Sequence, residues 1–226
     1  MRVRLVAFDV DGVLVEVKSS WRFLHSHFGV EEKAEEIRRM FSQGLIDYVK
    51  WMEMDTRLWI EARGGKLRRE ELLKALSQVR VEEEAIALAR ALKRRGVRIA
   101  LVSGGIDLLV ARVADAVGAD IWMSNKLSFD KNGLLLPGGF PLVGTQKDKA
   151  LRLLVSALGQ RLEETMYVGD SEFDRAAMGI AGHPVAFRDE GALSGAAKYK
   201  VKRLGEILDL IECIEKGGDC SAFRYL

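Results

Sequence analysis

Near its N-terminus the chain reads Leu5-Val6-Ala7-Phe8-Asp9-Val10-Asp11-Gly12-Val13. The four apolar residues predict a short buried strand, which ends where Asp9 introduces a charge. Asp11 lies two residues further on, and Gly12 allows the backbone to turn away tightly. A buried strand that ends directly in acidic residues is typical of a parallel α/β sheet, in which ligands bind beyond the carboxyl ends of the strands.

The rest of the chain repeats this pattern and alternates it with helices. Further apolar runs occupy residues 97–102, 165–168 and 184–187, and amphipathic helical patterns occupy residues 82–95, 107–117 and 147–158. A glycine follows each of these helical patterns, as expected at a helix C-terminus. Alternating strands and helices predict an α/β fold with a Rossmann-like parallel sheet covered on both faces.

Two segments interrupt the alternation. Residues 16–80 show helical periodicity over Glu31–Phe41, Ile46–Ala62 and Arg68–Val79, which predicts an all-helical domain inserted between the first two strands. The expected division is therefore an α/β core of residues 1–15 and 81–226 and a helical cap of residues 16–80. Residues 126–136 predict a small β-hairpin with Asn132-Gly133 in its turn.

Composition excludes several classes of protein. The 226 residues are 48% apolar and 30% charged with a formal net charge of +2, which does not suggest a nucleic-acid-binding surface or a polybasic membrane patch. Neither a membrane-spanning segment nor a secretory signal is recognisable, so a cytoplasmic location is expected. Few Gln and Asn beside many Lys, Arg and Glu indicate a thermophile. Cys213 and Cys220 are then either free thiols or one of the intracellular disulfides that hyperthermophiles tolerate.

Candidate functional residues gather at the predicted strand ends. They are Asp9, Asp11, Ser103, Asp170 and Asp174, together with Lys147 at a helix start. Hard divalent cations prefer oxygen ligands, and phosphate groups prefer ammonium and N–H donors. The set therefore predicts a site for a metal ion and a phosphate.

The ordered set of motifs resembles the haloacid dehalogenase superfamily. The four motifs are Asp9-Val10-Asp11-Gly12-Val13, Leu101-Val102-Ser103-Gly104-Gly105, Lys147, and Val168-Gly169-Asp170-Ser171-Glu172-Phe173-Asp174. The helical insertion is similar to the all-helical form of that superfamily's cap, and the hairpin is similar to its phosphoserine phosphatase-like branch.

The resemblance implies a Mg²⁺-dependent phosphatase of small phosphorylated metabolites. In it, Asp9 attacks phosphorus and becomes an aspartyl phosphate, while Asp11 acts as the acid and then the base. Ser103 and the amides around Gly104 hold phosphoryl oxygens, and Lys147 offsets the negative charge. Mg²⁺ is expected on Asp9, the main-chain carbonyl of Asp11, and Asp170, with Asp174 binding or orienting from behind.

Some positions depart from the family pattern or have rivals. Phosphoserine phosphatases carry a glutamate nine residues after the nucleophile, where this chain has Lys18, so phosphoserine itself is doubtful as the substrate. Lys149 is an alternative to Lys147. A phosphotransferase or phosphomutase shares the first half of the mechanism, and a phospho-accepting receiver-like signalling module uses a similar set of residues. In such a receiver, however, the accepting aspartate ends a middle strand.

The helix predicted at Ile46–Ala62 carries an apolar stripe that includes Trp59, with Asp55 in the middle of it. Packing against the other cap helices is one interpretation of this stripe. The other is that Trp59, with Asp55 nearby, faces the active site and helps to close it over the substrate.

Overall fold

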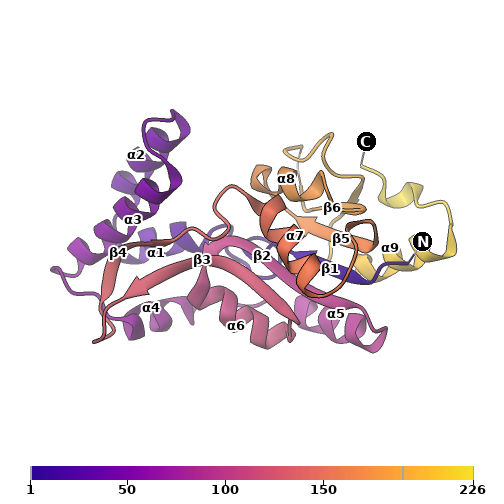
Figure 1. Ribbon diagram of the computed structural model, residues 1–226, viewed down its shortest axis with the longest axis horizontal. Coiled ribbons are helices and arrows are strands. Elements are labelled where there is room, and N and C mark those ends of the chain that lie inside the picture. The colour runs from indigo at the N-terminus through magenta and orange to yellow at the C-terminus, as the bar shows by residue number, and fades with distance from the viewer. Residues whose placement is uncertain (1, 190, 226) are drawn as a thin grey trace.

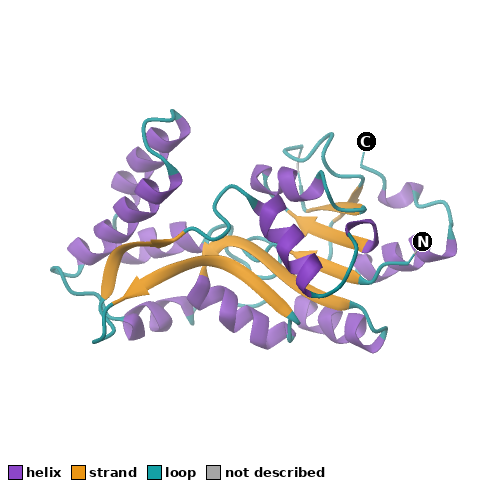
Figure 2. Ribbon diagram, in the orientation of Figure 1, coloured by secondary structure: helices purple, strands orange, loops and turns teal. Residues whose placement is uncertain are grey.

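The computed structural model describes residues 2–189 and 191–225, and in it a seven-stranded sheet forms the core (Figures 1 and 2). The strand order is β4-β3-β2-β1-β5-β6-β7, and all neighbours are parallel except β3 and β4. The strands are β1 (Leu5–Phe8), β2 (Arg98–Ile106), β3 (Ile121–Phe129), β4 (Leu135–Phe140), β5 (Thr165–Gly169), β6 (His183–Phe187) and β7 (Tyr199–Val201). The predicted α/β class is confirmed.

Helices cover both faces of this sheet. Val6 and Phe8 belong to the same buried cluster as residues of α5 (Glu83–Arg94), α6 (Asp107–Val117) and α9 (Glu206–Lys216). Leu5 and Ala7 instead belong to the cluster formed with α7 (Lys147–Ala157) and α8 (Arg175–Met178). Alternate residues of β1 therefore contact opposite helical layers, which explains why the whole strand is apolar.

The chain between β1 and β2 is helical, as predicted. It contains α1 (Ser20–Phe28), α2 (Glu31–Ser42), α3 (Tyr48–Ala62) and α4 (Arg69–Leu76). The last three match the predicted helices, whereas α1 was not predicted. The side chain of Ser19 accepts a hydrogen bond from the amide of Arg22, which caps this first helix at its N-terminus.

The hairpin extends the core sheet toward the cap helices. The first half of β3 pairs with β2, and its second half bends away to pair with the antiparallel strand β4 (Figure 1). The Asp130–Gly133 turn contains the predicted Asn-Gly pair, and Gly133 has a φ of 77°. The hairpin is tied to α3, because the amide of Gly138 donates to Thr56 Oγ1 at 2.7 Å.

Two strand segments were not predicted from the sequence. The start of β3 contains Trp122, which is 40% exposed, and β7 has only three residues at the edge of the sheet. Neither segment shows the continuous apolar run of a central strand. The described residues also contain three short 3₁₀ helices: η1 (Leu162–Glu164), η2 (Glu172–Asp174) and η3 (Ser221–Phe223).

Cys213 in α9 and Cys220 form a disulfide, so the free-thiol alternative is wrong. The bridge closes a short loop, with a sequence separation of 7 residues. Among the helices in the described ranges, none has both the length and the apolar character needed to cross a lipid bilayer.

Candidate active site

The carboxyl ends of three neighbouring strands form the base of a cleft of about 620 Å³. Asp9 follows β1, Ser103 lies in β2 near its end, and Asp170 follows β5. The central position of β1 between β2 and β5 brings these residues together. The base of the cleft is lined by Asp9, Asp11, Ser103, Gly104, Gly105, Lys147 and Asp170.

Lys147 joins two of the predicted acids. Its Nζ lies 2.7 Å from Asp9 Oδ2 and 2.7 Å from Asp174 Oδ1, and all three side chains are buried. Burial alone would lower the pKa of Lys147, but Asp174 and Asp9 raise it above its ordinary value. Burial raises the pKa of Asp9 to about 8 even though Lys147 opposes the shift, and Asp174 and Asp11 add to the rise. The nucleophile candidate therefore depends on nearby cations to remain ionised.

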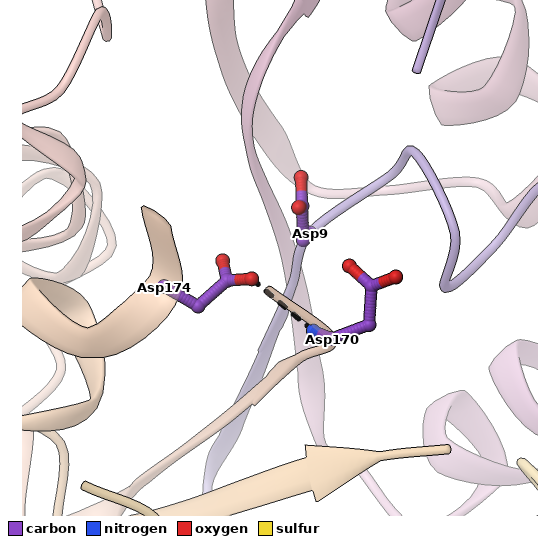
Figure 3. A group of neighbouring side chains, drawn as sticks. All are labelled: Asp9, Asp170 and Asp174. Carbon is purple, nitrogen blue, oxygen red and sulfur yellow. Dashed lines mark hydrogen bonds between the residues drawn. The ribbon is translucent and has the colours of Figure 1, made fainter. Parts of the chain in front are cut away.

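Asp174 is held more firmly than the other acids of the site. Its Oδ1 accepts hydrogen bonds from Lys147 and from the hydroxyl of Tyr167, each at 2.7 Å. Its Oδ2 accepts from the amides of Asp170 and Ser171, each at 3.1 Å, and from the Ser171 hydroxyl at 3.0 Å. With both oxygens engaged, Asp174 is arranged to orient Lys147 and the loop after β5. Figure 3 shows its hydrogen bond with the amide of Asp170.

Asp11 is held by the first turn of the cap. Its Oδ2 accepts hydrogen bonds from the amide and from the hydroxyl of Ser20, each at 2.7 Å. Its Oδ1 is buried without a hydrogen-bond partner among the described residues. Burial raises the pKa of Asp11, and the hydrogen bonds from Ser20 offset part of that rise. A carboxyl group with a raised pKa beside the nucleophile suits alternating acid and base roles.

Hydrogen bonds hold the backbone around the predicted phosphate-binding residues. The carbonyl of Gly104 accepts from Trp21 Nε1 at 3.0 Å and from Asn125 Nδ2 at 2.7 Å. Ser103 is fully buried, and its Oγ accepts a hydrogen bond from the amide of Gly105 at 3.0 Å. A hydroxyl that accepts one hydrogen bond can still donate its proton, so Ser103 can donate to an incoming oxygen atom.

The acids also fit a hard divalent cation. Each of Asp9, Asp170 and Asp174 offers a carboxylate oxygen, and these atoms lie within 4.8 Å of one another (Figure 3). A cation, the ammonium of Lys18, already lies 2.8 Å from Asp170 Oδ2. A Cβ on Gly12 would come within 2.2 Å of the same oxygen, so only glycine leaves this space open. An all-oxygen donor set of this kind matches Mg²⁺.

The structure corrects the prediction that Trp59 faces the active site and helps to close it. Trp59 is fully buried, belongs to the main hydrophobic cluster and is absent from the described lining of the cleft. Its indole N–H donates to His25 Nδ1 at 2.9 Å, and its ring stacks on Trp21. The helical periodicity placed Trp59 on the apolar stripe correctly, but this end of the stripe contacts α1. Asp55 does line the cleft, as predicted.

Several residues that hold the site were not predicted. Ser20 positions Asp11, Asn125 holds Gly104, and Tyr167 holds Asp174. Asn125 also accepts from the amides of Val143 and Gly144. Ser20, Asn125 and Tyr167 contact residues that are distant in sequence or lie behind the site. No local sequence pattern therefore identifies these three residues. The exposed Lys149 is separated from this network, which favours Lys147 over its rival.

Comparison with known proteins gives a consistent result. Residues 3–182 match the haloacid dehalogenase-like hydrolase family. A phosphoserine phosphatase of Methanocaldococcus jannaschii is 28% identical over 213 residues, which cover 92% of this chain and 98% of that protein. Another from Wolinella succinogenes is 29% identical over 210 residues, covering 91% and 98% respectively. A solved structure of a phospho-aspartyl intermediate analogue of phosphoserine phosphatase has a TM-score of 0.75 at 28% identity, covering 93% and 99% of the two chains.

The chain therefore belongs to the haloacid dehalogenase-like hydrolase family, with which both its sheet topology and its ordered acids agree. The receiver-like alternative is wrong. Within the family, the chain is a phosphoric monoester hydrolase of the phosphoserine phosphatase-like branch.

Proposed function

We propose that the protein is a Mg²⁺-dependent phosphatase that hydrolyses a small phosphomonoester through an aspartyl phosphate on Asp9. The observation that carries this proposal is the buried chain Asp9–Lys147–Asp174, with Asp11 beside it. A similar solved structure holds an analogue of a phospho-aspartyl intermediate, which supports the covalent route.

In the first half-reaction, an oxygen of Asp9 attacks phosphorus and the bond to the leaving alkoxide breaks. Asp11 gives its proton to that alkoxide, and its raised pKa suits this role. Lys147 offsets the charge of the nucleophile, because a phosphate dianion does not approach an uncompensated carboxylate. Ser103 donates its hydroxyl proton to a phosphoryl oxygen.

In the second half-reaction, Asp11 takes a proton from water, and the water oxygen attacks the phosphorus of the aspartyl phosphate. Inorganic phosphate leaves and Asp9 is restored. Bound Mg²⁺ supplies charge neutralisation for the phosphoryl group. Asp9, Asp170 and the main-chain carbonyl of Asp11 would hold it, while Asp174 orients Lys147 from behind.

The cleft supports a substrate other than phosphoserine. At the position nine residues after Asp9, Lys18 forms an ion pair with Asp170 at 2.8 Å. An ammonium at this position repels the amine of phosphoserine, so an amine held beside residue 18 is disfavoured.

The test is hydrolysis of p-nitrophenyl phosphate with and without Mg²⁺. EDTA should abolish phosphate release and added Mg²⁺ should restore it. Asp9→Asn should be inactive, while Asp11→Asn should lose turnover but still bind Mg²⁺, because the proposed contact of Asp11 is its main-chain carbonyl. Activity that survives chelation refutes the metal-assisted mechanism. Phosphate that passes to an acceptor without release of inorganic phosphate would favour the phosphotransferase alternative.

A further inference from the structure

Asp55 is an acid that the proposed mechanism leaves without a role. It lies in α3, is 3% exposed and lines the cap side of the cleft. Its Oδ1 has no hydrogen-bond partner within the described residues. A buried carboxylate normally requires a cation or several donors, because removal from water is costly.

The closest candidate for a compensating cation is His25, but its hydrogen bonding keeps it neutral. His25 Nε2 lies 3.4 Å from Asp55 Oδ2, while its Nδ1 accepts the indole N–H of Trp59 at 2.9 Å. An indole N–H can only donate, so Nδ1 must present a lone pair. The ring therefore has its proton on Nε2, and His25 offers Asp55 a neutral N–H donor and no positive charge.

The basic side chains of the cap wall do not compensate Asp55 either. Lys18 pairs with Asp170, and Arg38 pairs with Glu35. Arg22 lines the cleft but is exposed. Within the described residues, His25 is the one basic side chain whose nitrogen lies close to an oxygen of Asp55, and its contact is that of a neutral N–H donor. Burial raises the pKa of Asp55, and its interactions with His25 and with the side chain of Trp51 offset part of that rise.

Aromatic side chains line the same part of the cleft. Trp21, Phe41, Tyr48 and Trp51 all contribute to its wall. Trp51 stacks on Phe41 with ring centroids 4.4 Å apart, and Tyr48 meets both rings edge-on. Aromatic faces attract organic cations, and the attraction strengthens in a site shielded from water. A carboxylate beside several aromatic rings therefore favours a positively charged ligand group over a neutral or negative one.

We propose that Asp55 binds a cationic nitrogen carried by the leaving group of the substrate, so that the enzyme acts on amine-bearing phosphomonoesters. Trp59 and His25 are positioning residues, since they fix one oxygen of Asp55 and keep its charge uncompensated. This inference rests on the proposed phosphatase activity. The amine would lie against α3. It would not lie beside residue 18, because the ammonium of Lys18 would repel it there.

The test compares esters that differ in charge but hardly in shape. O-phosphoethanolamine is paired with propyl phosphate, and phosphocholine with 3,3-dimethylbutyl phosphate. Wild type should favour at least one charged ester over its neutral partner in kcat/KM by roughly 30-fold or more, the range expected for a desolvated charge pair. Asp55→Asn should remove this preference, because the amide keeps the shape but loses the charge.

A control and a stability measurement separate recognition from structural support. Glu61→Gln removes an exposed acid from the same helix and should leave the preference unchanged. Asp55→Asn should melt at the wild-type temperature or above it, since it removes an uncompensated buried charge. A parallel loss on charged and neutral esters together with a lower melting temperature would show that Asp55 is structural, and the inference fails.

Two further outcomes overturn the inference without touching the proposed function. One is equal turnover of charged and neutral esters by wild type. The other is a preference for 2-hydroxyethyl phosphate over O-phosphoethanolamine, which would mean that Asp55 accepts from a neutral hydroxyl. Absence of phosphate release from every ester, p-nitrophenyl phosphate included, would instead refute the proposed phosphatase activity itself.

Discussion

Replacing Lys147 with Met removes the ammonium between Asp9 and Asp174 while keeping an unbranched chain of similar volume. Each carboxylate lies 2.7 Å from Nζ. At an effective dielectric constant of about 20, each contact corresponds to an attraction of about 6 kcal/mol before desolvation is subtracted. Without Lys147 the two acids face each other with carboxylate oxygens within 4.8 Å, so one of them takes up a proton.

The substitution should therefore reduce both stability and rate. Breaking a buried ion pair by removing one partner costs about 3–5 kcal/mol of unfolding free energy. With no cation bound, the pKa of Asp9 is about 8 beside Lys147, and the loss of the ammonium should raise it further. A higher pKa means a smaller ionised fraction at neutral pH, so the rise of activity with pH should move to higher pH. Loss of the stabilising charge should also lower kcat by at least about 10³-fold.

The assay is a pH–rate profile in saturating Mg²⁺ together with urea unfolding. Lys149→Met is the matched control, because Lys149 is exposed two residues away on α7 and should lose neither rate nor stability. If Lys147→Met retained kcat within tenfold of wild type, or if Lys149→Met were equally impaired, the role given to Lys147 would be refuted.

Three other perturbations test the structure. Reduction of Cys213–Cys220 should lower the unfolding free energy by about 2 kcal/mol, as expected for a short loop, and Cys213→Ser should match the reduced protein; thiol titration of denatured, unreduced protein that finds two free thiols contradicts the disulfide. Trp59→Ala should destabilise the fold by about 3–5 kcal/mol in thermal unfolding, because the side chain is fully buried, and an unchanged melting temperature would contradict its core position. His183 is buried without partners for either ring nitrogen in the described structure, and burial lowers its pKa. The unfolded state therefore binds the proton more readily, so stability should fall as pH drops through the ordinary histidine pKa toward the lowered one; His183→Leu should lose less stability over that range, and equal pH dependence would contradict the assignment.

The sequence carried most of the information about the base of the site. Asp9, Ser103 and Asp170 follow or end apolar strands, and a parallel sheet brings such strand ends together whatever the details of packing. Asp11 and Asp174 were found because they lie within a few residues of these strand ends. Lys147 was identified from the order of the four motifs. It opens a helix, and no local sequence pattern connects the start of that helix to Asp9.

The cap wall was less predictable, because a helical stripe shows which residues share a face but not what that face contacts. Trp59 and Asp55 share the stripe of α3, yet Trp59 is buried against α1 whereas Asp55 lines the cleft. Helix α1 was itself missed, since nine residues with mixed polarity give a weak periodic signal. The tautomer of His25 depends on Trp59, 34 residues away, and only the tertiary structure reveals it.

The continuous strand β3 has a consequence for how this protein could be rebuilt. One end of β3 belongs to the parallel sheet and the other to the hairpin. The hairpin backbone forms hydrogen bonds with Thr56 of α3, with Leu67, and with Arg69 at the start of α4. The insertion after β1 is thus not an interchangeable module attached at two points. A chimera that exchanged residues 16–80 alone would set foreign helices against a native hairpin, whereas one that exchanged the hairpin with them would preserve this contact. Exchange of substrate specificity between members of the family should therefore succeed when the helical insertion and the hairpin come from the same parent protein.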